Sequence, residues 1–403
     1  MSIIRDITLQ AKKYLKSDEI LLFIGARQAG KTTILKQIKE YLEKNSKAAV
    51  HYLNLEDFEY LSLLNKTPKN IFKILPIDKK RKNYVFIDEV QYLKNPSNFL
   101  KYLFDEYQGI IKLIVSGSSA FYLDKKFKDS LAGRKKIFYV PTLSFREFLK
   151  FKNEKVLSKK DFKKLSLTEK EKIAVYYREF MIYGGYPRVV LAKKDKKEEV
   201  LREIAFSYIK KDIYEAGIKQ EETFYKLFRI LASQTGGLFN ALELSNTLGV
   251  SKTAIDNYLY VMRKSFHIAF LKPFFRNTRK ELTKMPKIYF YDLGLRNFFA
   301  NNFKPFEEMD GKGALLENAA FRQMRELFNK DQLKFWRTAQ KNEVDFIENE
   351  KRAFEVKMNP NNFKKSKYKK FFELYPDIVL SIISIDKKSD KFLNYRVFDV
   401  WEI

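Results

Sequence analysis

The chain has 403 residues, and its 78 Lys and Arg residues against 50 Asp and Glu residues give a formal net charge of +28. This length favours two or three domains, and a hydrophobic content of 45% is enough to fill their cores. The positive excess favours polyanionic partners, nucleic acid above all, although a general abundance of Lys gives the same balance. The absence of Cys excludes disulfides and thiolate metal sites, and two His residues exclude a multi-His zinc site.

The N-terminal residues, MSIIRDITLQAKKYLKSDEI, mix charged and apolar positions and lack the apolar segment of a signal peptide. No apolar run reaches the roughly 20 residues that a membrane-spanning helix needs. We therefore expect a cytoplasmic protein with no membrane association.

Residues 1–150 alternate short apolar runs with amphipathic stretches. The runs EILLFIG, AAVHYLNL, NYVFIDE, IKLIVSGSS and KIFYVPT have the character of buried strands, and KTTILKQIKEYLEKN has helical spacing of its apolar residues. Strands that alternate with helices predict an α/β fold with a parallel sheet covered on both faces.

A phosphate-binding loop is predicted directly after the first of these strands. The segment fits the P-loop pattern of Gly, four residues and Gly-Lys-Thr, in which main-chain amides and a helix N-terminus face phosphate oxygens. We expect Lys31 to reach the β and γ phosphates of ATP and Thr32 to coordinate Mg²⁺. The predicted nucleotide-binding residues are Gly25, Ala26, Arg27, Gln28, Ala29, Gly30, Lys31, Thr32 and Thr33.

The strand YVFIDE supplies the acids that complete such a site. Asp88 is predicted to hold the Mg²⁺ shell, and Glu89 to orient and deprotonate the attacking water. Ser118, after the fourth strand, is a candidate sensor of the γ-phosphate, or else a loop serine. Arg134 is a candidate for neutralising transition-state charge, in cis or from a neighbouring subunit, or else an ordinary solvated Arg.

The pattern changes beyond residue 150. Residues 151–222 are predicted to form a helical linker or lid with a turn at YGGYP, and residues 223–293 a winged-helix module. In this module Ser251 would cap a second helix that presents Lys252 and Asn257 to DNA. The basic residues Arg276, Arg279 and Lys280 would contact phosphates from the wing, although many winged helices only pack against other domains.

Residues 294–403 carry acids in the order of a metal-dependent nuclease. Asp345 precedes Glu355-Val356-Lys357, which fits Asp…(Asp/Glu)-x-Lys, and side-chain alternation puts Glu355 and Lys357 on one side of a strand. Glu317 on a preceding helix adds a third acid. We expect Glu317, Asp345 and Glu355 to bind Mg²⁺ and Lys357 to act on the water or the phosphate. The alternative is a cross-strand ion pair.

These motifs together resemble the AAA-type ATPases of archaea and bacteria that carry a C-terminal DUF4143 region. The resemblance covers nearly the whole chain and rests on GARQAGKTT, YLNLEDFEY, FIDEVQ, SGSSA, LAGRKKIFYVPTLSFREFL, YGGYP, KKDI and the C-terminal acids. It implies an ATPase core, a winged-helix middle and a C-terminal domain of the PD-(D/E)XK nuclease-like, restriction-endonuclease type, and it points to the same Glu317.

The first functional hypothesis is Mg²⁺-dependent ATP hydrolysis that drives or gates an activity on DNA, with cleavage by the C-terminal domain as one form of it, within a homo-oligomer. Two alternatives stay open. One is a nucleotide-operated switch whose C-terminal domain docks a partner without cleaving, and the other is a DNA-binding regulator whose affinity is set by ATP.

Overall fold

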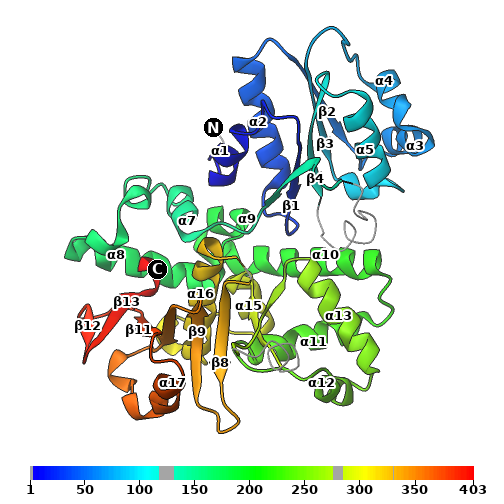
Figure 1. Cartoon of the computed structure of the whole chain (residues 1–403). Coiled ribbons are helices and arrows are strands. Elements are labelled where there is room, and N and C mark those ends of the chain that lie inside the picture. The colour runs from blue at the N-terminus through cyan, green and yellow to red at the C-terminus, as the bar shows by residue number, and fades with distance from the viewer. Residues whose placement is uncertain (1–2, 118–130, 276–284, 330) are drawn as a thin grey trace. The chain divides into compact units, whose positions relative to one another are not determined.

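The computed structural model describes residues 3–117, 131–275, 285–329 and 331–403. The chain divides into two compact units, Met1–Thr142 with Lys264–Phe266, and Leu143–Arg263 with His267–Ile403 (Figure 1). Over the described ranges, no helix combines the length and the apolar character that a bilayer crossing requires.

The first unit is an α/β layer structure. In chain order its elements are α1 (Asp6–Lys12), β1 (Ile20–Ile24), α2 (Lys31–Asn45), β2 (Ala49–Asn54), α3 (Phe58–Lys66), α4 (Ile71–Ile74), β3 (Asn83–Asp88), α5 (Pro96–Glu106), β4 (Ile111–Gly117) and β5 (Lys135–Tyr139).

All five strands of the first unit run parallel, in the order β2-β3-β4-β1-β5. This confirms the predicted parallel sheet, and each of the five apolar runs supplies one strand. Strand β4 lies between β1 and β3. Because the three strands are parallel, their C-terminal ends lie next to one another on the same side of the sheet. The loop after β1 and the acids at the end of β3 therefore flank the end of β4.

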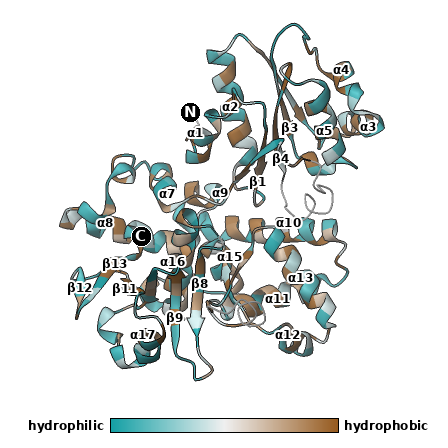
Figure 2. Ribbon diagram, in the orientation of Figure 1, coloured by the Kyte–Doolittle hydropathy of each residue, from teal (hydrophilic) through white to brown (hydrophobic). Residues whose placement is uncertain are grey.

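Side-chain alternation gives the sheet of the first unit two buried faces. Leu21 and Phe23 of β1 pack with apolar residues of α1 and α2, while Leu22 and Ile24 pack with residues of α3 and α5 on the other face. Figure 2 shows hydrophobic residues along the strands of this unit and hydrophilic residues on the outer sides of its helices. The strand from which the P-loop leaves is thus packed on both of its faces.

The second unit contains helices, a two-stranded ribbon and a mixed sheet. Its elements are α7 (Phe145–Phe151), α8 (Leu167–Tyr183), α9 (Pro187–Leu191), α10 (Lys197–Ala216), α11 (Glu221–Ser233), α12 (Ala241–Leu248), α13 (Lys252–Lys264), β6 (Ile268–Leu271), β7 (Lys287–Phe290), α15 (Leu293–Phe299), α16 (Lys312–Leu327), β8 (Leu333–Arg337), β9 (Glu343–Glu348), β10 (Arg352–Val356), α17 (Lys369–Leu374), β11 (Val379–Ser384), β12 (Lys391–Phe392) and β13 (Tyr395–Asp399).

The segment predicted as a winged-helix module contains the helix pair α12 and α13 and a two-stranded ribbon. Gly249 ends α12 with φ of 67°, a left-handed conformation that glycine adopts readily, and the Ser251 hydroxyl accepts a hydrogen bond from Ala254 N at 3.2 Å. Strands β6 and β7 pair antiparallel. Arg276, Arg279 and Lys280, predicted for the wing, lie outside the described residues.

The mixed sheet has the strand order β12-β13-β11-β10-β9-β8. Helix α16 packs on one face, where Phe346, Phe354 and Ile383 belong to the same core as residues of α7 and α8. Phe371 of α17 covers the opposite face with Trp336. Apart from Lys264–Phe266, the segments 151–222, 223–293 and 294–403 fall within one compact unit, and their division into three domains stays a prediction.

A tight joint around YGGYP fixes the start of the second unit. Leu143 N donates to Gly185 O at 2.7 Å, and Gly185 N donates to the buried Asp292 carboxylate at 2.8 Å. A Cβ on Gly184, whose φ is 74°, would lie 2.1 Å from Asp292 Oδ1. This turn therefore needs glycine for close packing, which explains the motif without a catalytic role.

Candidate functional site

The P-loop connects β1 to α2 at the C-terminal edge of the parallel sheet. Gly30 has φ of 98° and Gln28 has φ of 53°, so the loop curls through two left-handed residues before α2 begins. The first hydrogen bond of α2 runs from Ile34 N to Gly30 O at 3.0 Å. The amides of the first turn precede that bond and make a helix N-terminus suited to phosphate.

Lys31 is buried at the base of this loop. Its Nζ donates to the carbonyl oxygens of Gly25 and Ala26, at 3.0 Å in each case. A Cβ on Gly25 would lie 2.1 Å from Val140 O, so only glycine allows the chain to pass this close to the strand that follows β5. Of the other predicted nucleotide-binding residues, Arg27 and Ala29 are buried, and Gln28 and Thr33 are exposed.

Asp88 at the end of β3 gathers hydroxyl groups from three other elements. Oδ2 accepts hydrogen bonds from the Thr32 hydroxyl at 2.7 Å and from the Tyr52 hydroxyl at 2.7 Å, and Oδ1 accepts one from Ser116. Burial and the bond to Asp88 raise the pKa of Tyr52 above its ordinary range, which keeps this phenol a neutral donor. The structure thus joins the predicted Mg²⁺ ligands Thr32 and Asp88 directly.

Glu89 follows in a left-handed conformation with φ of 57°. Its amide donates to Ser116 Oγ at 3.1 Å, and its carboxylate accepts a hydrogen bond from the Gln91 side chain. A non-glycine residue in this region carries strain that the surroundings must hold, and such residues gather at functional sites. Ser116 and Gln91 therefore fix the residue predicted to be the general base.

Arg5, next to α1, stabilises the P-loop from behind. Its guanidinium is buried and donates to Ala29 O at 2.7 Å and to Pro141 O at 3.1 Å. One cationic side chain thus connects the loop before Gly30 to the segment that follows β5. The sequence gives no local signal for Arg5, because its partners lie 24 and 136 positions away.

Two weaker candidates have different outcomes. Ser118 lies outside the described residues. Arg134 O accepts a hydrogen bond from the backbone N of Ile20, the first residue of β1. Arg134 therefore lies beside the N-terminal end of β1, whereas the P-loop follows the C-terminal end of that strand. Its guanidinium pairs with Asp105 at 2.7 Å. A role for Arg134 at the phosphate site of its own chain is therefore wrong, and only the role in a neighbouring subunit stays a prediction.

The donor set of the first unit fits Mg²⁺ and a triphosphate. Thr32 and Asp88 present hard oxygen ligands, which Mg²⁺ selects, beside a helix N-terminus and a buried ammonium that suit phosphate. The hydroxyls of Tyr52 on β2 and Ser116 on β4, the two strands next to β3, donate hydrogen bonds to the Asp88 carboxylate. No sequence motif predicts these two residues, because their contact with Asp88 depends on the order of the strands in the sheet.

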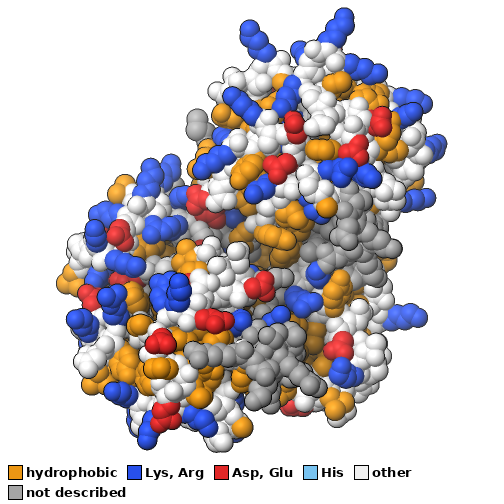
Figure 3. Space-filling model, in the orientation of Figure 1, with side chains coloured by type: hydrophobic (Ala, Val, Ile, Leu, Met, Phe, Trp, Pro, Cys, Tyr) orange, Lys and Arg blue, Asp and Glu red, His pale blue; other side chains and the backbone are white. Residues whose placement is uncertain are grey.

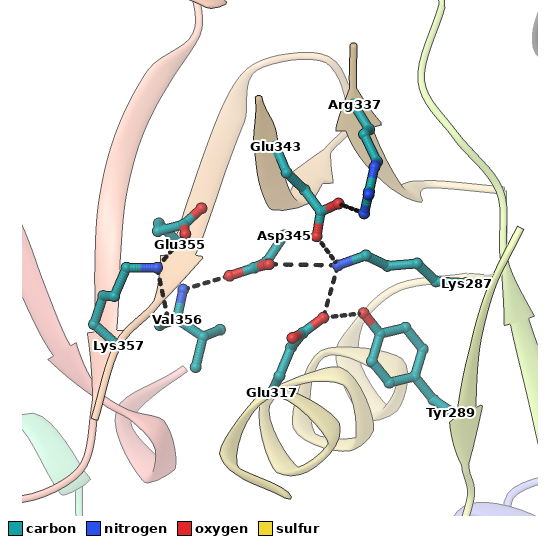
Figure 4. Close-up of polar contacts among 9 residues, drawn as sticks. All are labelled: Lys287, Tyr289, Glu317, Arg337, Glu343, Asp345, Glu355, Val356 and Lys357. Atoms are coloured by element: carbon teal, nitrogen blue, oxygen red, sulfur yellow. Dashed lines mark hydrogen bonds and ion pairs between the residues drawn. The ribbon is translucent and has the colours of Figure 1, made fainter. Parts of the chain in front are cut away.

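The C-terminal acids lie in the second unit around a buried lysine. Lys287 of β7 has no solvent exposure, and its Nζ lies 2.8 Å from Glu317 Oε1, 2.5 Å from Glu343 Oε1 and 3.4 Å from Asp345 Oδ1 (Figure 4). We call Lys287, Glu317, Glu343 and Asp345 the lysine–carboxylate cluster. Arg337 donates to the other oxygen of Glu343 at 2.6 Å.

Further hydrogen bonds hold the cluster. The Tyr289 hydroxyl donates to Glu317 Oε1 at 2.6 Å, and Val356 N donates to Asp345 Oδ2 at 2.8 Å. Glu355 is buried on β10 and pairs with the ammonium of Lys357. The predicted residues Glu317, Asp345, Glu355 and Lys357 are thus brought close together, as Figure 4 shows.

The electrostatics of this region reflect burial among like charges. Burial, followed by the charge of Asp345, raises the pKa of Glu317 to about 7 and that of Glu355 to about 8. Burial alone would lower the pKa of Lys287, but Tyr289 and the surrounding carboxylates outweigh it and raise that pKa well above its usual value.

The arrangement does not fit the predicted Mg²⁺ site. Among the described residues, no group of three or more acidic or His side chains is disposed to hold a metal ion. An ammonium lies among the oxygens of Glu317, Glu343 and Asp345 instead. Sequence reasoning missed Lys287, Tyr289 and Glu343, although a lysine opening the otherwise apolar strand KIYF was a visible anomaly.

The predicted DNA-reading helix has one informative contact. Lys252 Nζ lies 2.7 Å from Asp256 Oδ2 one turn along the exposed face of α13. This pair partly neutralises the charge that Lys252 would offer to a phosphate.

Comparison with protein families matches three successive segments. Residues 17–149 match the model described as AAA domain, residues 175–305 a domain of unknown function, DUF8612, and residues 312–401 a domain of unknown function, DUF4143. The two outer matches agree with the resemblance drawn from the motifs.

Among curated proteins the chain is similar to uncharacterized proteins. One from Methanocaldococcus jannaschii is 29% identical over 351 residues, covering 85% of this chain and 74% of that protein. One from Haemophilus influenzae is 28% identical over 296 residues, covering 71% and 70%. One from Mycobacterium tuberculosis is 23% identical over 363 residues, covering 88% and 73%.

Two of the solved structures that the chain matches have low scores. AMPPCP-bound DnaA from Aquifex aeolicus has a TM-score of 0.29 and 16% identity, with 65% of this chain and 89% of that chain covered. Cdc6p from Pyrobaculum aerophilum has a TM-score of 0.31 and 11% identity, with 73% and 91% covered. The match of residues 17–149 to an AAA domain agrees with the parallel sheet and its P-loop, and residues 312–401 are similar to DUF4143.

Proposed function

We propose that the first unit binds ATP with Mg²⁺ and hydrolyses it. The observation that carries this proposal is the 2.7 Å hydrogen bond between the Thr32 hydroxyl and Asp88, beside the buried ammonium of Lys31. It supports the proposal because it brings the two halves of a P-loop site, from β3 and from the start of α2, into direct contact.

Each residue then has a separate role. Lys31 exchanges its carbonyl partners for phosphate oxygens, and the amides at the start of α2 bind the same phosphates. Thr32 and Asp88 would hold Mg²⁺, which supplies neutralisation of phosphate charge. Glu89 accepts the proton of the attacking water, while Ser116 keeps Asp88 and the Glu89 backbone in register.

The test is release of inorganic phosphate from ATP, measured with and without Mg²⁺. Lys31→Ala is expected to abolish turnover. Lys39→Ala is the matched control, because Lys39 lies on the same helix in an exposed ion pair with Glu43. An unchanged rate of phosphate release in Lys31→Ala would contradict the assignment of the P-loop as the ATP-binding site.

We infer that the second unit associates with nucleic acid, most plainly DNA, through a winged-helix module formed by α12, α13 and the β6–β7 ribbon. The net charge of +28 supports this inference. Figure 3 shows Lys and Arg side chains spread over the face drawn rather than gathered in one patch, so the inference rests on overall charge and on the helix pair. Binding should weaken steeply with salt, and salt-insensitive or absent binding would contradict it.

For the C-terminal domain we favour the non-cleaving alternative, in which ATP operates a switch or sets affinity for DNA. Lys287 among the carboxylates supports this choice, because it neutralises acids that the nuclease hypothesis needs for metal. The test is a matrix of DNA and RNA substrates with and without ATP and Mg²⁺. Cutting that Asp345→Ala abolishes, with ATP turnover intact, would favour the nuclease hypothesis, whereas the nuclease-like fold of residues 294–403 stays a prediction in either case.

A further inference from the structure

The lysine–carboxylate cluster has the composition of a cation site, and a side chain already provides the cation. Its three carboxylates come from α16 and β9, and the ammonium arrives from β7, a strand of the separate ribbon (Figure 4). The sequence places Glu317 and Asp345 30 and 58 positions after Lys287.

The spacing of the oxygens suits an ammonium. The N–O distance of 2.8 Å to Glu317 is that of a charge-assisted hydrogen bond, Glu343 Oε1 lies closer at 2.5 Å, and Asp345 Oδ1 lies farther away at 3.4 Å. Mg²⁺ would draw its oxygens in to about 2.1 Å and would demand near-octahedral geometry. A divalent ion and this ammonium would also repel each other if both were buried among the same oxygens.

The cluster is closed on the side of Glu317 by main chain. A Cβ on Gly236, which has φ of 78°, would lie 3.0 Å from Glu317 Oε2, and Gly236 N donates to Ile288 O at 2.9 Å. The main chain at Leu238 bridges to Lys287 itself. The turn before α12 and the ribbon therefore cover the ammonium, which is why Lys287 has no solvent exposure.

Charge is close to balanced without any metal. Glu317, Glu343, Asp345 and Glu355 supply four carboxylates, and Lys287, Arg337 and Lys357 supply three cations paired with them. A buried carboxylate without a partner is costly, so the loss of Lys287 would leave three acids in need of a replacement cation.

We propose that Lys287 is the resident counter-ion of this cluster: it takes the place of a divalent metal and ties the β6–β7 ribbon to the C-terminal sheet, so that this site binds no Mg²⁺ or Mn²⁺ while Lys287 is present. The inference is independent of ATP hydrolysis in the first unit, and the two are tested by different measurements.

The first experiment follows thermal unfolding of the full chain, without nucleotide, over a series of Mn²⁺ concentrations. Lys287→Ala should unfold at a lower temperature than wild type, and Mn²⁺ should raise its midpoint progressively because the freed carboxylates bind the ion. Adding Asp345→Asn to Lys287→Ala should remove that rise. A Lys287→Ala protein that folds and does not respond to Mn²⁺ would overturn the proposal.

Lys112→Ala is the matched control. Lys112 is also a buried lysine, but it belongs to the first unit and donates to main-chain oxygens of Ser17 and Glu19 rather than to carboxylates. It should lose stability, and its response to Mn²⁺ should not exceed that of wild type, to which the P-loop contributes. An equal Mn²⁺ response in Lys112→Ala would show a non-specific effect and would count against the cluster.

The second experiment holds even if Lys287→Ala fails to fold. Wild type and Asp345→Asn are titrated with Mn²⁺ under the same conditions, and the P-loop contributes equally to both. We expect identical Mn²⁺ responses. A Mn²⁺ stabilisation of wild type that Asp345→Asn removes would show that the site takes metal with Lys287 in place, and the proposal would be wrong.

Discussion

The Thr32 hydroxyl lies 2.7 Å from Asp88 Oδ2, although the two residues are 56 positions apart in the chain. The parallel sheet makes this contact, since the loop after β1 and the end of β3 emerge at the same edge with β4 between them. The same carboxylate accepts hydrogen bonds from Tyr52 and Ser116. Asp88 is thus oriented by three hydroxyls, which is the preorganisation that a phosphate-transfer site needs.

Replacing Ser116 should impair chemistry more than nucleotide binding. Ser116→Ala removes both the donor to Asp88 and the acceptor for Glu89 N, so the carboxylates lose their alignment while the P-loop amides remain. We expect ATP turnover to fall about tenfold or more, in the range of positioning effects. The measurement compares kcat with the Kd for a non-hydrolysable ATP analogue. A weakened Kd with unchanged kcat would contradict this role.

Arg5→Ala should weaken ATP binding. The guanidinium donates to Ala29 O and Pro141 O from a buried position, and a buried charged hydrogen bond contributes roughly 1.5–3 kcal/mol. We expect about a tenfold rise in the Kd for ATP, which corresponds to about 1.4 kcal/mol. Arg146→Ala, which removes an Arg that donates to Ser158 O and Lys160 O in the second unit, is the control and should leave the Kd unchanged.

Arg134 provides a test of assembly. Its guanidinium pairs with Asp105 at the sheet edge away from the P-loop of its own chain, so any catalytic effect must come through another subunit. If it acts in trans, mixing Arg134→Ala with Lys31→Ala should restore part of the ATP turnover that each variant lacks alone. Full activity of Arg134→Ala by itself would leave it as a surface ion pair, worth under about 1 kcal/mol.

The raised pKa of Glu355, about 8, predicts a pH dependence of stability. A carboxyl whose folded pKa exceeds its unfolded pKa binds its proton more tightly in the folded chain, so it makes stability fall as pH rises from about 4.5 to about 8. Glu355→Gln should flatten this slope by up to about 1.4 kcal/mol per pH unit. Denaturant unfolding of both proteins between pH 5 and pH 8 measures the difference, and parallel curves would contradict the buried, proton-holding carboxyl.

The first unit was predictable because its evidence is local. Five apolar runs separated by amphipathic stretches predict a parallel sheet, and the spacing of the P-loop motif identifies the residues that form the loop. Ser116 was missed because its role depends on β4 lying between β1 and β3, which no single segment reveals. The sequence left open whether Arg134 acts in its own chain or in a neighbouring subunit, because only the pairing of β5 with β1 shows that Arg134 lies at the N-terminal end of the sheet.

The second unit shows the limit of motif reading. The order of Glu317, Asp345 and Glu355 on a helix and two strands was predicted, and the structure brings these acids together. A short motif does not include a side chain that comes from another part of the chain, such as Lys287 of the β6–β7 ribbon. Lys287 changes the chemistry of the cluster from that of a metal site to that of a buried ion network, and only the tertiary fold reveals it.

The most direct test of the central claim is the rate of phosphate release from ATP by Glu89→Gln, measured beside its Kd for ATP. We expect the amide to keep nucleotide binding near the wild-type value and to lower turnover by about 100-fold or more, because only proton acceptance is lost. Turnover equal to wild type would contradict it, and so would a wild-type protein that releases no phosphate above the level of Lys31→Ala.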